Sequence, residues 1–266
     1  MATSFDKVKK SIQMRENTDR QMSNFWLFLY FLPVFVLIVA VGYFMVTFMA
    51  QFSSVEFVTD YDFIYNEISS DVAWPWVLVG LSWFTSMFVG LIVPYFLVNR
   101  RKTHFNRQKL LCENLITGID SVAQTKEVDV QDSLLALQKN VEETNSDRTD
   151  KNPILWAVLS AFIPFLSLYV FYFLVSDFYQ HEQLENSFWQ QSSNAMDQLG
   201  INFSVPQRTV PMPNRSFVLY LILTIVTMSL FGAYWLYVLL KDPNQHFDYH
   251  KLVETQLLMA IESVEL

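Results

Sequence analysis

Residues 25–50 read FWLFLYFLPVFVLIVAVGYFMVTFMA and contain no Asp, Glu, Lys, Arg or His. A helix needs about 20 such residues to cross roughly 30 Å of hydrocarbon. Three further stretches of this kind follow, at 74–98, 153–175 and 217–240. Only 17% of all residues are charged, whereas soluble domains carry about 25%. The sequence therefore predicts an all-α integral membrane protein with four transmembrane helices.

The basic residues predict how these helices are oriented. Cytoplasmic loops retain Lys and Arg, and 16 of the 18 basic residues lie in segments 1–24, 99–152 and 241–266. The intervening loops, 51–73 and 176–216, contain only Arg208 and Arg215. We therefore expect a multi-pass protein of the cell membrane. Its N- and C-termini would be cytoplasmic, and 51–73 and 176–216 would be outer loops.

The two expected outer loops are acidic. They hold nine Asp and Glu residues against two Arg, which gives −7 of the chain's net charge of −8. Such a surface would concentrate cations near the membrane. It would equally be an ordinary solvated face, and the sequence does not separate these alternatives.

The polar segments contain amphipathic helical patterns. In 99–152, Leu111, Leu115 and Ile119 share one helical face, and a second amphipathic helix follows, which predicts a cytoplasmic helical hairpin. One amphipathic helix is expected within 176–216, ending at Gly200, and another within 241–266. These apolar faces would pack within the chain or against another subunit, and both alternatives stay open.

An internal repeat relates the last three apolar stretches. At an offset of 65 residues, Tyr169, Tyr172, Asp177 and His181 match Tyr234, Tyr237, Asp242 and His246; at an offset of 142, Thr85, Gly90, Tyr95 and His104 match Thr227, Gly232, Tyr237 and His246. Each unit would hold one span, so the third and fourth spans would form an inverted pair. Inverted pairs are common in transporters, and duplication of a membrane helix also produces them.

The best-defined part of the repeat, within residues 216–247, resembles a known signature. Thr227, Gly232, Tyr234, Trp235 and Tyr237 match Thr-x-Gly-Ile-Tyr-Gly-x-Tyr-Trp-x-Tyr in place, with Ser229 for the first Gly and Phe231 for the first Tyr. This signature is found in a prokaryotic family of small membrane proteins of uncharacterised function. The resemblance implies a small helical-bundle membrane module and no particular activity.

The chain has few residues suited to chemistry within the expected spans. They contain none of the charged residues or histidines that ion-coupled transporters and proton pumps place inside the membrane. No phosphate-binding loop, nucleophile elbow or Cys-x-x-Cys pair is present, and the single Cys112 excludes an intrachain disulfide. There is no strongly basic patch for nucleic acid. We therefore expect no catalytic residues and no nucleic-acid partner.

One candidate metal site lies near the C-terminus. Asp242, His246, His250 and Glu254 recur every four residues on one helical face. Imidazoles one turn apart can bind one ion, and a carboxylate can complete the ligand set. The four residues span about 18 Å at a rise of 1.5 Å per residue, so only the two histidines and one carboxylate could bind together. Alternatively, Asp242 caps the helix before Pro243 and the row is a solvated face. Asp177, His181 and Glu185 repeat the spacing.

Three functions remain open from these observations. The leading hypothesis is a non-catalytic membrane protein that acts by association with membrane-protein partners or with itself, in contact with the lipid bilayer. The first alternative is an oligomeric pore for cations or small solutes. The second alternative is a membrane protein that binds a divalent metal, the only cofactor considered, through its C-terminal helix.

Overall fold

The computed structural model describes residues 4–54, 61–146, 150–163 and 165–265. Every regular element in these ranges is a helix, so the predicted all-α class is confirmed for them. The helices are α1 (Asp6–Gln13), α2 (Arg15–Thr18), α3 (Trp26–Ser54), α4 (Tyr61–Lys126), α5 (Gln131–Ser146), α6 (Pro153–Phe162), α7 (Phe165–Gln198), α8 (Phe217–Val226) and α9 (Leu230–Glu265).

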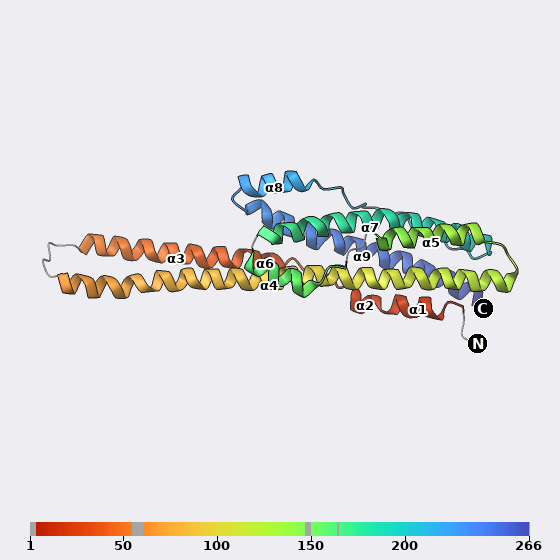
Figure 1. Cartoon of the computed structure of the whole chain (residues 1–266), viewed down its shortest axis with the longest axis horizontal. Helices are drawn as coiled ribbons and strands as arrows, with labels where there is room; N and C mark the ends of the chain where they lie inside the picture. Colours follow the sequence, from red (N-terminus) through yellow and green to blue (C-terminus); the bar gives the residue numbers. More distant parts are fainter. Residues whose placement is uncertain (1–3, 55–60, 147–149, 164, 266) are drawn as a thin grey trace.

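Helices α3 and α4 form a long arm that projects from a helical bundle (Figure 1). Two helical stretches, Trp26–Ala50 and Trp76–Lys126, are long and apolar enough to cross a membrane. Helix α4 has 66 residues and continues without a break from the expected second span into the bundle. The expected outer loop 51–73 lies partly outside the described residues, and its part from Tyr61 onward belongs to α4.

The third apolar stretch is a helical hairpin and not one straight helix. Helix α6 ends at Phe162, and Ile163 has an extended backbone with φ −126° and ψ 87°, as expected for the residue before a proline. Helix α7 then runs back along α6, as the packing of the Trp156 ring on the Phe173 ring shows. Lys151, just before α6, contacts Asp177 of α7 at 2.9 Å.

The fourth apolar stretch has the same form. Helix α8 ends in a turn at Met228 and Ser229, whose φ values of 48° and 74° reverse the chain. The Thr227 hydroxyl accepts a hydrogen bond from the backbone N–H of Phe231 at 2.9 Å and so caps the start of α9. At the base of this hairpin, Arg215 contacts Asp242 at 2.9 Å.

The prediction of four transmembrane helices is therefore not confirmed for the third and fourth stretches, since two helices of the described residues are long and apolar enough to cross a membrane. Helices α6 and α8 have 10 residues each, about 15 Å at 1.5 Å per residue, which is half of a hydrocarbon core. Each hairpin brings the chain back to its starting end. Segment 176–216 consequently lies with 99–126, as the 2.7 Å contact between Arg101 and Asp177 shows. As the predicted outer loop, this segment would instead lie opposite 99–152.

The bundle at the other end of α4 contains the main hydrophobic core. The predicted face of Leu111, Leu115 and Ile119 is fully buried there, together with Val253 and Leu257 of α9. Helices α1, α5 and α7 add further side chains to the same core. The amphipathic faces thus pack within the chain, which answers the alternative that the sequence left open.

Candidate metal centre

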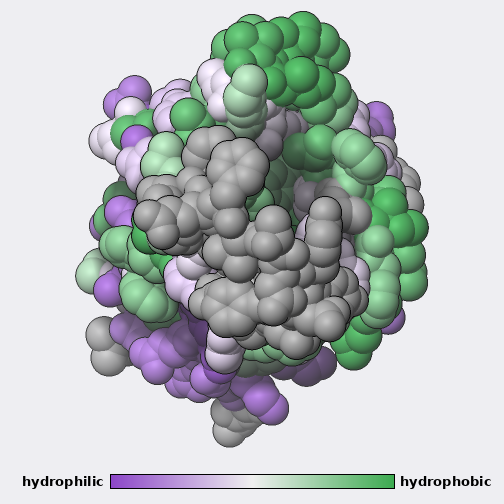
Figure 2. Space-filling model, turned by 90° about the vertical axis from the view of Figure 1, so that its left-hand side faces the viewer, coloured by the Kyte–Doolittle hydropathy of each residue, from purple (hydrophilic) through white to green (hydrophobic). Residues whose placement is uncertain are grey.

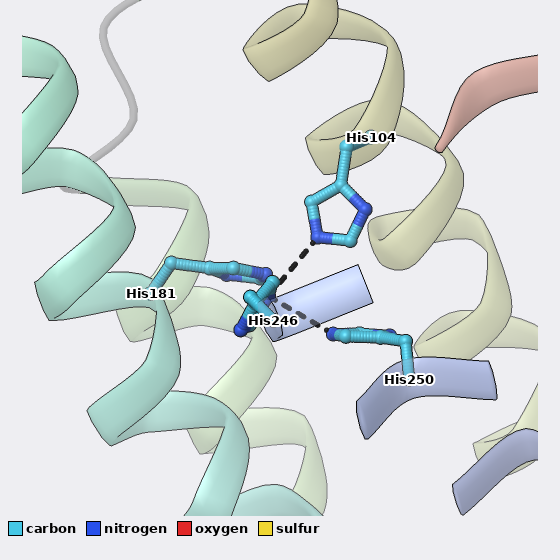
Figure 3. A group of neighbouring side chains, drawn as sticks. All are labelled: His104, His181, His246 and His250. Atoms are coloured by element: carbon cyan, nitrogen blue, oxygen red, sulfur yellow. Dashed lines mark hydrogen bonds between the residues drawn. The ribbon is translucent and has the colours of Figure 1, made fainter. Parts of the chain in front are cut away.

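All histidines of the protein meet at one place inside the bundle. The chain has 4 His in 266 residues, and these are His104 on α4, His181 on α7, and His246 and His250 on α9 (Figure 3). Their side chains are between 0% and 4% exposed. One ring nitrogen from each lies within 4.8 Å of the others. Three helices therefore bring four metal-binding side chains to a common point.

The spacing of the ring nitrogens suits a single ion. His246 Nε2 lies 3.3 Å from His104 Nε2 and 3.1 Å from His250 Nε2. Four nitrogens placed tetrahedrally at 2.0–2.1 Å from Zn²⁺ would be about 3.3 Å apart. His246 cannot donate a hydrogen bond in both contacts, because its Nε2 carries at most one hydrogen. A cation between the rings would instead accept the lone pairs of all these nitrogens.

Carboxylates contact the outer nitrogens of three of these rings. Asp19 lies 3.1 Å from His104 Nδ1, Glu182 lies 3.4 Å from His246 Nδ1, and Glu254 lies 3.4 Å from His250 Nδ1. A carboxylate in this position holds the proton on Nδ1 and leaves Nε2 as the metal ligand. The three Nε2 atoms concerned are the ones that converge at the centre.

Glu185 reaches the inner side of the cluster. Its Oε1 lies 2.6 Å from His250 Nε2 and accepts a hydrogen bond from Trp189 Nε1 at 2.8 Å. Burial disfavours the charged form of His250, but Glu185 and Glu254 outweigh burial and raise the pKa of His250 to about 9. Without a metal ion, His250 is therefore an imidazolium between two carboxylates. Its Nε2 proton occupies the position that a metal ion would take.

The imidazoles of His104 and His246 are held neutral. Burial lowers the pKa of His104 to about 3, although the Asp19 carboxylate acts in the opposite direction. Burial and the charge of His250 lower the pKa of His246. Neutral imidazole is the form that binds metals, so the proton of His250 has to leave.

Three arginines balance the carboxylates around the histidines. Arg107 contacts Asp19 at 2.7 Å and Glu254 at 2.6 Å. Arg15 contacts Glu254 at 3.0 Å, and Arg208 contacts Glu182 at 2.9 Å. Four carboxylates (Asp19, Glu182, Glu185 and Glu254) and three guanidinium groups leave a net charge of −1 before the histidines are counted.

The residues of the predicted C-terminal row lie in different surroundings; the row consists of Asp242, His246, His250 and Glu254. His246 and His250 lie at the centre. Glu254 contacts the outer Nδ1 of His250 and two arginines, so it supports the centre from outside. Asp242 lies away from it and pairs with Arg215. The row is not a solvated face, because His246, His250 and Glu254 are at most 1% exposed.

Sequence reasoning did not bring the four histidines together. His181 was considered with Asp177 and Glu185 as a separate row of the same spacing, on the other side of the membrane, and His104 was considered only as part of the internal repeat. The repeat carried the relevant signal, since His104 and His181 stand 142 and 65 residues before His246. The three histidines that correspond in the repeat, His104, His181 and His246, all lie in the cluster, together with His250.

The other repeat positions lie on α4 and along the two hairpins. Gly90 allows close approach of α6 to α4, because a Cβ at that position would be 3.3 Å from the backbone of Ser160 and Ala161. Gly232 lies against Tyr30, whose hydroxyl donates to Ser229 O at 2.9 Å. Thr85 and Tyr95 make contacts within α4. The contacts of the remaining positions lie on the two hairpins, and these positions are Tyr169, Tyr172, Thr227, Tyr234 and Tyr237.

No protein-family description, no curated protein and no solved structure matches this chain. The similarity of residues 216–247 to an uncharacterised membrane-protein family stays a prediction.

Proposed function

We propose that the protein is a membrane-anchored metal-binding protein whose buried four-histidine centre joins α4 to the two hairpins α6–α7 and α8–α9. One observation carries the proposal: every histidine of the chain reaches this centre, with ligand atoms within 4.8 Å of one another. Three of the rings also have a carboxylate on the outer nitrogen. Imidazole ligands suit Zn²⁺ and neighbouring divalent transition metals.

The geometry favours a structural metal ion over a catalytic one. Catalytic zinc sites keep one coordination position open to water or substrate, whereas structural sites are closed by four protein ligands. Here four histidines are available and all are buried. The ion would link α4, α7 and α9 at the level where the membrane arm enters the bundle. Its proposed role is to fix the arrangement of the hairpins.

The membrane placement that we propose has two crossing helices. Helices α3 and α4 span the bilayer, and the hairpins α6–α7 and α8–α9 enter it from the bundle side to about half its depth. Exposed apolar side chains at the two hairpin tips support this placement: Phe165 is 81% exposed and Met228 is 91% exposed. Basic residues gather on the bundle side, which supports a cytoplasmic bundle.

A metal analysis of the purified protein tests the proposal directly. Protein extracted in mild detergent and loaded with Zn²⁺ is expected to retain about one ion per chain after gel filtration, as a closed four-ligand site requires. Substitution by Co²⁺ is expected to give the strong visible absorption of tetrahedral nitrogen coordination. Zinc-loaded, correctly folded protein with less than about 0.1 ion per chain would contradict the proposal.

Metal binding is expected to release one proton per ion between pH 6 and pH 8. His250, with a pKa of about 9, holds its inner proton throughout this range, and the metal must displace it. The apparent affinity should therefore rise about tenfold per pH unit and level off above pH 9. Calorimetry in buffers of different ionisation enthalpy measures the protons released.

The matched variant for the pH experiment is Glu185→Gln, which removes one of the two carboxylates beside His250. Its proton release at pH 8 should fall well below one, because the imidazolium loses its main charge partner. Equal proton release by the variant and the parent protein, or none by either at pH 8, would contradict the assigned role of His250.

Cysteine labelling tests the placement of segment 176–216. In a Cys112→Ala background, Ser187→Cys and Thr117→Cys, both at exposed positions, are expected to react alike with an impermeant maleimide. Both should be protected in intact cells and labelled after lysis, whereas Trp74→Cys marks the opposite end of α4. Labelling of Ser187→Cys alone in intact cells would support four spans and contradict the placement proposed here.

A second candidate function is association through the arm. Apolar side chains of α3 such as Phe35, Ile38 and Val46 are 64%, 64% and 70% exposed, so lipid or other membrane helices must cover them. The mass of the particle extracted from its native membrane tests this function. Other polypeptides or several identical copies in the particle would support it, and a lone chain would not.

A further inference from the structure

A second site lies at the base of the α8–α9 hairpin, away from the histidines. A cavity of about 220 Å³ opens between α7, α8 and α9. Aromatic rings form much of its wall, from Tyr172, Tyr179, Phe217, Tyr220 and Trp235. Arg215 and Ser216, directly before α8, form another side. The cavity thus combines an apolar wall with polar groups gathered at one end.

Trp235 on the cavity wall has an unsatisfied donor. Its side chain is buried, with 1% of the residue exposed, and its indole N–H has no hydrogen-bond partner among the described residues. Buried N–H groups in folded proteins are nearly always paired. A ligand in the cavity that carries acceptor oxygens would supply the missing partner.

The remaining polar groups at this end also suit an anionic ligand. Ser216 caps α8 by accepting a hydrogen bond from the backbone N–H of Leu219 at 3.3 Å, and the other N–H groups of the first turn attract negative charge. Arg215 donates to Asp242 at 2.9 and 3.1 Å and to the Tyr220 hydroxyl at 2.8 Å. A guanidinium has five N–H donors, so two remain for a ligand.

The surroundings of the cavity indicate the kind of ligand. Helix α8 leads away from it with strongly exposed apolar side chains, among them Val218, Ile222 and Ile225 at 62%, 51% and 68%. Viewed from the end of the arm, a strongly hydrophobic patch lies at the top, where α8 lies in Figure 1, and much of the hydrophilic surface lies at the bottom (Figure 2). Acyl chains would cover this apolar face, while an attached headgroup would reach the polar end of the cavity.

We infer that this cavity binds the phosphate-bearing headgroup of a membrane phospholipid, whose acyl chains lie along α8. The Trp235 N–H, the α8 N-terminus and Arg215 would donate hydrogen bonds to the phosphate or ester oxygens. The inference rests on the membrane placement proposed above, because only that placement brings the base of α8 to the level of lipid headgroups. It does not depend on metal binding.

Native mass spectrometry of the detergent-purified full chain tests the inference. Phosphatidylglycerol, diacylglycerol with the same acyl chains, and inorganic phosphate are supplied separately. We expect retention of phosphatidylglycerol alone, because diacylglycerol lacks the phosphate and free phosphate lacks the chains. Trp235→Phe keeps the ring but removes the donor, and it should weaken lipid retention about tenfold, as loss of a hydrogen bond to a charged group does.

Two further variants keep the result interpretable. Trp156→Phe makes the same change in the α6–α7 hairpin and should leave lipid retention unchanged. The pair Arg215→Gln with Asp242→Asn removes the guanidinium without leaving a lone charge, and it should weaken retention at least as much as Trp235→Phe. Equal retention of diacylglycerol, binding of free phosphate as tight as that of lipid, or unchanged retention in both cavity variants would overturn the inference.

The membrane placement is checked separately by extraction at alkaline pH. Protein released from the membrane by this treatment would contradict the placement itself, and with it the lipid site. Protein that stays in the membrane but retains no phosphatidylglycerol would overturn the lipid site alone.

Discussion

His246→Ala is expected to reduce bound metal from about one ion per chain to less than about 0.1. His246 lies at the middle of the cluster, because its Nε2 is within 3.3 Å of the Nε2 atoms of both His104 and His250. Without it the remaining imidazoles cannot close a four-ligand shell. Element analysis of zinc-loaded, gel-filtered protein measures the loss, and the thermal midpoint of the variant should no longer respond to added Zn²⁺.

The matched control is Asp242→Asn, one helical turn before His246. Asp242 belongs to the same four-residue row in the sequence, but the structure pairs it with Arg215 away from the centre. This variant should keep its full metal content. Glu182→Gln should show an intermediate result, since loss of a carboxylate behind a ligand weakens metal affinity about 10- to 100-fold. Metal loss in Asp242→Asn with retention in His246→Ala would contradict the centre described above.

Arg107→Leu is expected to lower the free energy of unfolding by about 3–5 kcal/mol. The Arg107 side chain is fully buried and contacts Asp19 at 2.7 Å and Glu254 at 2.6 Å. Burial acts to raise the pKa of Asp19, but the hydrogen bond with His104 and the charge of Arg107 outweigh it and hold that pKa far below its usual value. Removal of Arg107 would leave these carboxylates ionised, buried and poorly compensated. Thermal or denaturant unfolding of metal-free protein in detergent measures the effect.

Two controls separate the loss of charge from the loss of a side chain. Lys109→Leu changes a basic residue two positions away whose side chain is 46% exposed, and it should alter stability by no more than about 0.5 kcal/mol. Arg107→Leu combined with Asp19→Asn and Glu254→Gln removes the unbalanced charges and should recover part of the loss. Similar stability of Arg107→Leu and Lys109→Leu would show that Arg107 does not hold these elements together.

Several features of the protein were determined by the sequence alone. The charge-free stretches and the four-residue spacing of apolar side chains predicted an all-α protein, because both follow from local chain geometry. The face of Leu111, Leu115 and Ile119 was predicted for the same reason and is buried. The spacing of His246 and His250 predicted that they lie one helical turn apart, and both are at the centre.

Only the tertiary structure decided how far each apolar stretch extends and what it brings together. A composition window cannot distinguish one long helix from two short helices joined by a turn, because both are equally apolar. The turns at Ile163 and at Met228–Ser229 depend on packing against α4 and α3. By reversing the chain they place α7 and α9 beside α4, so histidines up to 146 residues apart become neighbours. The sequence supplied the four histidines, and long-range packing brought them to one place.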